Sequence, residues 1–143
     1  MEHLSTSKWK EYQDYTIERF DASGVDYDPY WHVFIEDILH PELFELVQIE
    51  WPDFEAGRCQ WAFRNNAINQ NQNRKIYQPN RTDGPEFWKQ YYDNIIDNPN
   101  IISAAYRLEG LHTTPDYVTA SVWEDYAGYS VSNHIDDYTI DLA

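Results

Sequence analysis

The sequence predicts an α+β fold in which helices come first and strands follow. Through most of residues 1–115, apolar residues recur every three to four positions, which is the spacing of one helix face. From Asp116 onward apolar and polar residues alternate, and the segment is rich in Val, Thr, Tyr and Trp. At 143 residues, 17% of them aromatic, the chain is long enough to bury one core. We therefore expect a single domain, 1–143, that is mainly helical in 1–115 with one early strand and forms strands in 116–143.

The first expected element is an amphipathic helix from Ser7, as its cap, to about Phe20, ended by Gly24. Its apolar face would hold Trp9, Tyr12, Thr16 and Phe20. The early strand is expected at residues 29–35, PYWHVFI, because a dense apolar and aromatic run is typical of a strand covered on both faces.

A second helix is expected to begin at Pro41 and to end at Trp51-Pro52, since proline suits the first helical position. Glu42 and Glu45 would lie near its positive end. Residues 65–80 are rich in Asn and Gln and predict a mobile surface loop, with a substrate-facing lid as the alternative. The apolar face of this second helix would comprise Leu43, Phe44, Leu46, Val47 and Ile49.

Two more helices are expected before the strands. One opens at residues 83–86, and the other starts at Asn98-Pro99 and continues to about Leu108. The first of these two would bury a wide stripe made of Phe87, Trp88, Tyr91, Tyr92, Ile95 and Ile96.

Composition excludes several classes of function. With 25 Asp and Glu against 10 Lys and Arg, the net charge of -15 repels phosphate backbones and anionic membranes, so no direct nucleic-acid partner is expected. Cys59 is the only cysteine, which excludes an internal disulfide and a cysteine-rich zinc site. No apolar stretch approaches the roughly 18 residues of a membrane span, and the N-terminal residues lack a signal-peptide core. A cytoplasmic protein is expected.

The candidate chemical site is His134-Ile135-Asp136. On an extended strand His134 and Asp136 would point to the same face, beside an apolar stripe that continues through Tyr138, Ile140 and Leu142. An imidazole and a carboxylate placed in this way are two of the three ligands of a 2-His-1-carboxylate iron site. A polar turn between two strands is the alternative interpretation of the same residues.

The residues before this motif carry a resemblance. Residues 120–136 read ASVWEDYAGYSVSNHID, which is a strand, Tyr126, a turn at Gly128, a second strand and then His134-x-Asp136. This order resembles the Fe(II)/2-oxoglutarate dioxygenases of the prolyl-hydroxylase-like type. The resemblance implies an oxidoreductase whose N-terminal helices pack on a double-stranded β-helix, or jelly roll.

A looser resemblance covers the upstream residues, so that the two together span 29–143. Residues 33–39, the helix from Pro41 and the Trp51-Pro52 pair are similar to the strand, helix and Trp-Pro that precede that family's jelly roll. This part is weakly specific, because many folds share such an order of elements.

The resemblance also implies cofactors and ligands. Fe(II) and 2-oxoglutarate would be the cofactors, His134 and Asp136 the metal ligands, and Tyr126 a contact to the 2-oxoglutarate carboxylate, with a core tyrosine as the alternative. No residue is assigned a catalytic role. The family's second metal-binding histidine and its 2-oxoglutarate-binding Arg or Lys lie several strands later and have no counterpart here.

We therefore expect the N-terminal portion of such an oxygenase, with an incomplete jelly roll. A truncated fragment, a split enzyme completed by a C-terminal segment, and a non-catalytic remnant all remain open. An uncovered sheet edge would favour self-association. Within the chain, candidates for the missing histidine are His3, His32 as a hydrogen-bonded core residue, His40 as a helix-flanking residue, and His112 as the best placed. The competing function is an acidic, non-catalytic binding protein that occupies a basic partner surface.

Overall fold

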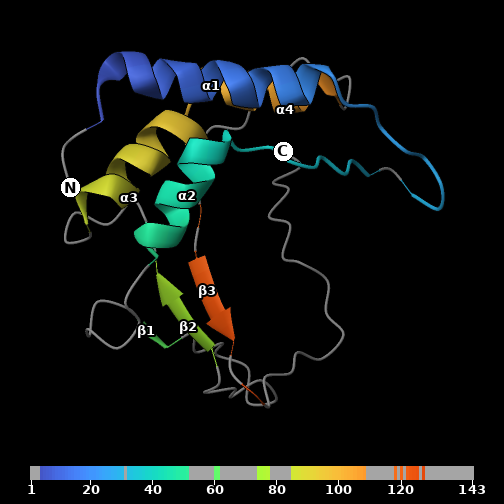
Figure 1. Cartoon of the computed structure of the whole chain (residues 1–143). Coiled ribbons are helices and arrows are strands. Elements are labelled where there is room, and N and C mark those ends of the chain that lie inside the picture. The colour runs from blue at the N-terminus through green and yellow to red at the C-terminus, as the bar shows by residue number, and fades with distance from the viewer. Residues whose placement is uncertain are drawn as a thin grey trace, which may run out of the picture. The chain divides into compact units, whose positions relative to one another are not determined.

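The computed structural model describes residues 4–30, 32–51, 60–61, 74–77, 85–108, 118, 120, 122–125 and 127. The chain divides into two compact units, one drawn from residues 1–52 and 78–121 and the other from residues 53–77 and 122–143. The described helices belong to the first unit and the described strands to the second (Figure 1).

Helix α1 (Thr6–Asp21) opens the helical unit, and most of its predicted face is confirmed. Trp9, Tyr12 and Thr16 are buried. The cap is Ser5, two residues earlier than predicted, whose hydroxyl accepts from the amide of Lys8 at 3.2 Å. The helix ends at the C-cap Ala22, before Gly24 is reached.

Helix α2 (Pro41–Ile49) begins at the predicted proline, and Glu50 is its C-cap. The predicted apolar face is confirmed in part, because Leu43 is buried and Leu46 and Val47 are half-buried. It is wrong for Phe44, which is 51% exposed, and for Ile49, which is 74% exposed. The stripe of a helix that faces a core covers only part of the helix surface. The five apolar residues predicted for this face of α2 are too many to fit on that stripe, so some of them face solvent.

The two later helices form where the sequence predicts them. Helix α3 (Glu86–Tyr91) follows Pro85 and passes directly into a π-helix, η1 (Tyr92–Ile96), which was not predicted. Helix α4 (Pro99–Leu108) then runs to the predicted end. The predicted stripe is confirmed in its main members, since Phe87, Trp88, Tyr92 and Ile95 are buried. Helix α1 packs against η1 and α4, as Figure 1 shows for α1 and α4.

The early strand predicted at residues 29–35 is wrong for the residues of that range that the structure describes. Asp26 and His32 form an isolated antiparallel bridge, with both backbone hydrogen bonds at 2.9 Å, and no named strand includes either residue. The side chains of this run are also not covered on both faces, because Tyr30 is 68% exposed and Phe34 is 80% exposed. Because no strand among the described residues pairs with its amides, the described part of this apolar run is a loop.

The second unit contains a three-stranded antiparallel sheet in the order β1-β2-β3. Strand β1 is Gln60–Trp61, β2 is Arg74–Tyr77 and β3 is Val122–Asp125. The loop predicted for residues 65–80 is wrong at residues 74–77, where β2 forms, because pairing with two neighbours satisfies the backbone of a segment with little sequence periodicity. The rest of that range lies outside the described residues. Strand β3 lies in the predicted strand region. The jelly roll itself stays a prediction.

Replacing Leu43 by Ala tests whether α2 is held by this one side chain. Leu43 has no exposed surface, so we expect the free energy of unfolding to fall by about 2–5 kcal/mol. Phe44→Ala is the matched control on the same helix, with an expected loss below about 1 kcal/mol because half of Phe44 is in solvent. Urea unfolding followed by far-ultraviolet circular dichroism measures both. Equal losses would contradict the burial pattern.

Candidate functional site

The predicted iron site lies outside the described residues. This holds for His134, Asp136 and Tyr126, and also for His3 and His112. Strand β3 ends at Asp125, one residue before Tyr126. Among the residues that the structure describes, no group of three or more His, Cys, Asp or Glu side chains could hold a metal ion. The metal ligands therefore stay predictions.

His40 is confirmed as a helix-flanking residue, and its role is specific. Its Nδ1 accepts a hydrogen bond from the amide of Glu42 at 3.2 Å, so the imidazole is the N-cap of α2. An accepting Nδ1 requires the tautomer with the proton on Nε2, which lies 3.7 Å from a carboxylate oxygen of Glu11. The ring packs between Tyr12 and Tyr15, with both centroid distances at 5.2 Å. His40 is therefore explained by helix capping without a metal.

His32 is not the core histidine that the sequence predicts. Its side chain is 39% exposed, although it is hydrogen-bonded as expected, with Nδ1 lying 2.8 Å from the carbonyl oxygen of Tyr30. Its Nε2 lies 3.9 Å from a carboxylate oxygen of Asp26. These contacts belong to the loop closed by the Asp26–His32 bridge.

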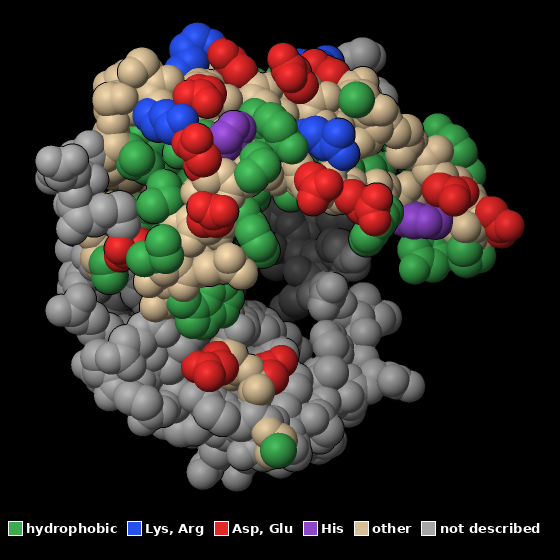
Figure 2. All heavy atoms as spheres, in the orientation of Figure 1, with side chains coloured by type: hydrophobic (Ala, Val, Ile, Leu, Met, Phe, Trp, Pro, Cys, Tyr) green, Lys and Arg blue, Asp and Glu red, His purple; other side chains and the backbone are tan. Residues whose placement is uncertain are grey.

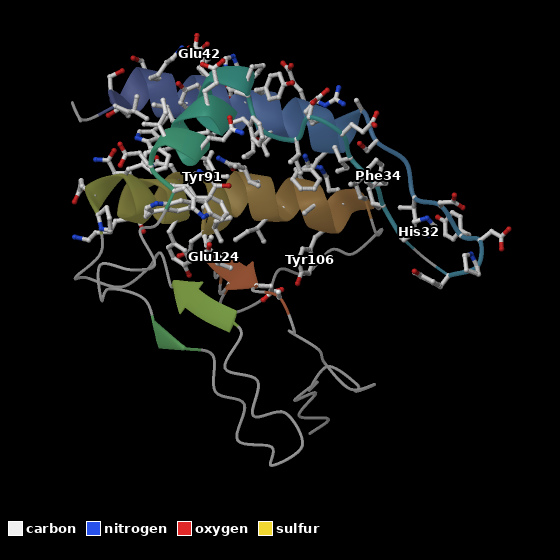
Figure 3. All side chains as sticks on the ribbon, turned by 60° about the horizontal axis from the view of Figure 1, so that its bottom comes forward. His32, Phe34, Glu42, Tyr91, Tyr106 and Glu124 are labelled. Atoms are coloured by element: carbon white, nitrogen blue, oxygen red, sulfur yellow. The ribbon has the colours of Figure 1, made fainter. Side chains whose placement is uncertain are left out.

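A charged network joins α1 to the first turn of α2. Lys8 Nζ lies 2.5 Å from Glu42 and 3.0 Å from Glu11, and the Tyr12 hydroxyl donates to Glu42 at 3.3 Å. The two carboxylates raise the pKa of Lys8, and Lys8 in turn lowers the pKa of Glu42. Burial raises the pKa of Tyr12, so its hydroxyl remains a donor at neutral pH. Glu42, labelled in Figure 3, thus binds two groups of α1 while its own amide is capped by His40.

The helical unit also holds an apolar hollow of about 680 Å³. Its polar side chains are Thr16, Tyr91 and Tyr106, and none of its lining side chains carries a charge at neutral pH. The Thr16 hydroxyl donates to the carbonyl of Ile38 at 3.1 Å. The remaining lining residues are Phe20, Ile38, Leu39, Ile95, Ile96, Ile101, Ile102, Ala105, Val118 and Ala120.

Two tyrosines give this hollow its remaining polar character (Figure 3). Burial raises the pKa of Tyr91, which keeps its hydroxyl protonated. No hydrogen-bond partner of the Tyr91 or Tyr106 hydroxyl is found among the described residues. The hollow can hold an apolar group with a hydrogen-bonding end, but it has no ionised group for acid-base or metal chemistry.

Sequence reasoning did not identify the hollow. The apolar spacing of Ile101, Ile102, Ala105 and Tyr106 was visible as a helix face, but the space beside it depends on how α1, η1 and α4 pack. The π-helix adds to the difficulty, because its i→i+5 bonding turns the residues after Tyr91 away from the α-helical register.

Comparison with known proteins assigns no family. The chain matches no protein-family model, and no curated protein or solved structure is significantly similar to it. In the described part of the chain, no helix has the length and apolar character to cross a membrane.

Replacing Glu42 by Gln tests the network through its pH dependence. Lys8 lowers the folded-state pKa of Glu42, so the ionised carboxylate stabilises the fold above the ordinary value of 4.5. This stabilisation is lost as the pH falls through the lower folded-state pKa. We expect wild type to be more stable than the variant near neutral pH, and the difference to vanish as the pH falls below about 4.

The control for this experiment is Glu45→Gln, which removes the same charge from an exposed position of the same helix. Its stability difference from wild type should be small, because Glu45 forms no ion pair with a described residue. Urea unfolding over the pH series measures both variants. A Glu42→Gln difference that stays constant from neutral to acid pH would contradict the ion pair.

Proposed function

We propose that this chain carries the N-terminal portion of an Fe(II)- and 2-oxoglutarate-dependent oxygenase of the hydroxylase type. The observation that carries the proposal is the order of Tyr126, Gly128, His134 and Asp136 directly after an extended strand. Strand β3 brings the backbone to Asp125 in extended form, paired along its length with β2. If residues 134–136 form an extended strand, His134 and Asp136 share one of its faces.

Part of the helical unit agrees with the resemblance at a coarser level. The resemblance implies a proline-initiated helix before a Trp-Pro pair, and α2 begins at Pro41 and ends at Ile49, before Trp51. The strand that the resemblance implies at residues 33–39 does not form, because these residues are a loop. The helix after Pro85 and the helix from Pro99 also form before the strand that leads to Tyr126. An all-helical or an all-strand fold would not have this order of helices followed by a strand.

In this proposal the chain's own residues bind and orient the cofactors. His134 would provide a neutral imidazole nitrogen, Asp136 a carboxylate oxygen and Tyr126 a hydroxyl for the 2-oxoglutarate carboxylate. Fe(II) and 2-oxoglutarate, when bound, supply the activation of O₂ needed to hydroxylate a C–H bond. The second histidine and the basic residue for 2-oxoglutarate are not assigned to this chain. We propose that a complementing segment, or a partner strand paired at an open sheet edge, supplies them.

The charge and cysteine content of the chain bear on its partners and on its cellular compartment. A net charge of -15 disfavours nucleic acid as a direct partner, and Cys59, as the only cysteine, is compatible with a reducing compartment. We therefore place the proposed oxygenase in the cytoplasm.

Metal binding tests the proposal directly. Titration of the full chain with Co(II), followed by its visible absorption, should show binding that His134→Ala and Asp136→Ala each weaken by at least about tenfold, because each removes a direct ligand. Co(II) replaces Fe(II) here because it does not oxidise during the measurement.

Asp137→Ala is the matched control. Asp137 adjoins Asp136, carries the same charge and would point to the opposite face of an extended strand. This control should bind Co(II) as wild type does. If wild type binds no better than His134→Ala, or if Asp137→Ala weakens binding as much as Asp136→Ala, the assigned metal site is wrong.

A further inference from the structure

Among the described residues of the helical unit, the three most exposed aromatic side chains lie on one loop. We call residues 26–37 the aromatic loop; the structure describes all of it except residue 31. Phe34 is 80% exposed and Tyr30 is 68% exposed. Figure 3 shows His32 and Phe34 on this loop, which extends beyond the helices. Aromatic side chains of this size rarely remain in water without a binding role when several gather on one segment.

The aromatic loop has a defined shape. The Asp26–His32 bridge closes it with two backbone hydrogen bonds, and the Asp26 carboxylate accepts from the amide of Asp28 at 3.1 Å. Its C-terminal end is fixed to α1, because Arg19 donates to the carbonyl of Glu36 at 2.8 Å and Thr16 donates to the carbonyl next to the loop. A surface that is already ordered loses less conformational entropy on binding than a flexible one.

The aromatic loop is also acidic, and its carboxylates have no Lys or Arg partner among the described residues. It carries Asp26, Asp28, Glu36 and Asp37, all exposed, and no Lys or Arg. None of these four carboxylates forms an ion pair with a described Lys or Arg, whereas Lys10 pairs with Asp14 and Arg107 pairs with Asp21 on the helices. Figure 2 shows hydrophobic and acidic side chains together on the loop. The loop therefore combines apolar contact area with negative charge that no described Lys or Arg neutralises.

We propose that the aromatic loop is a docking surface for a partner protein that presents Lys or Arg side chains around an apolar pocket. Tyr30 and Phe34 would enter the pocket or stack beneath a guanidinium group, and the carboxylates would pair with the surrounding cations. A second copy of this chain is disfavoured as the occupant, because two surfaces of chains with a net charge of -15 repel each other. The same charge disfavours anionic membranes and nucleic acid. This inference does not rest on the oxygenase proposal.

The test uses the full chain and a synthetic peptide of alternating Arg and Leu, with a Glu and Leu peptide as the negative probe. Nuclear magnetic resonance titration should place the largest amide shifts in residues 26–37 with the Arg peptide and no shifts with the Glu peptide. The double variant Tyr30→Ser/Phe34→Ser should weaken binding of the Arg peptide by at least about tenfold. These side chains are exposed, so the fold should be unchanged by circular dichroism.

Two double variants, each of which removes two negative charges, distinguish the effect of charge on the loop from the effect of the chain's total charge. Asp26→Asn/Asp28→Asn changes the loop and keeps an acceptor at residue 26, while Glu18→Gln/Glu45→Gln changes exposed carboxylates on α1 and α2. The loop pair should weaken Arg-peptide binding at least about fivefold and the helix pair less than about twofold. Ile49→Ser, at an equally exposed apolar position on α2, should have no effect.

Three results would overturn the proposal. These are equal weakening by the two charge variants, amide shifts centred on the helices, and absence of Arg-peptide binding at millimolar concentration. Concentration-dependent dimers in sedimentation that Phe34→Ser dissociates would assign the loop to self-association and would overturn the choice of partner.

Discussion

The helical unit is held together by hydrogen bonds from the polar ends of four buried aromatic side chains, those of Trp9, Tyr12, Trp88 and Tyr92. Trp9 is 3% exposed, and its indole N–H donates from α1 to Gln90 of α3 at 3.2 Å. Trp88 is 2% exposed, and its N–H donates to the carbonyl of Glu50, the C-cap of α2, at 2.5 Å. An unpaired N–H at either position would cost about 1–3 kcal/mol, so these two bonds fix where three helices meet.

Two buried tyrosine hydroxyl groups are paired in the same way. The Tyr12 hydroxyl reaches from α1 to Glu42 at the start of α2, and the Tyr92 hydroxyl donates from η1 to the carbonyl of Val118. Helix α2 is therefore held at its N-terminal end through Glu42 and at its C-terminal end through Glu50, with Leu43 as its buried contact. This explains how a nine-residue helix keeps a fixed position while leaving Phe44 and Ile49 in solvent.

Local signals made the helices predictable, and their absence elsewhere explains the errors. Pro41 and Pro99 mark helix starts by removing a donor that the first turn does not use, and the spacing of Trp9, Tyr12 and Thr16 is a property of α1 alone. Whether the apolar run around Phe34 becomes a strand depends on a distant pairing partner, which no local pattern encodes. The prediction of a strand at residues 29–35 failed for that reason. Strand β2 was missed because its pairing partner β3 is distant in sequence, and its own residues show little periodicity.

The candidate sites divide in the same way. His134 and Asp136 were found from a motif, which needs only neighbouring residues, whereas the apolar hollow and the exposure of the aromatic loop come from tertiary packing. The hollow and the loop are also physically joined. Ile38 follows the loop directly, lines the hollow and accepts the Thr16 hydrogen bond. Ile38 therefore belongs to both features, because it borders the aromatic loop and its position beside the hollow is fixed by the hydrogen bond from Thr16.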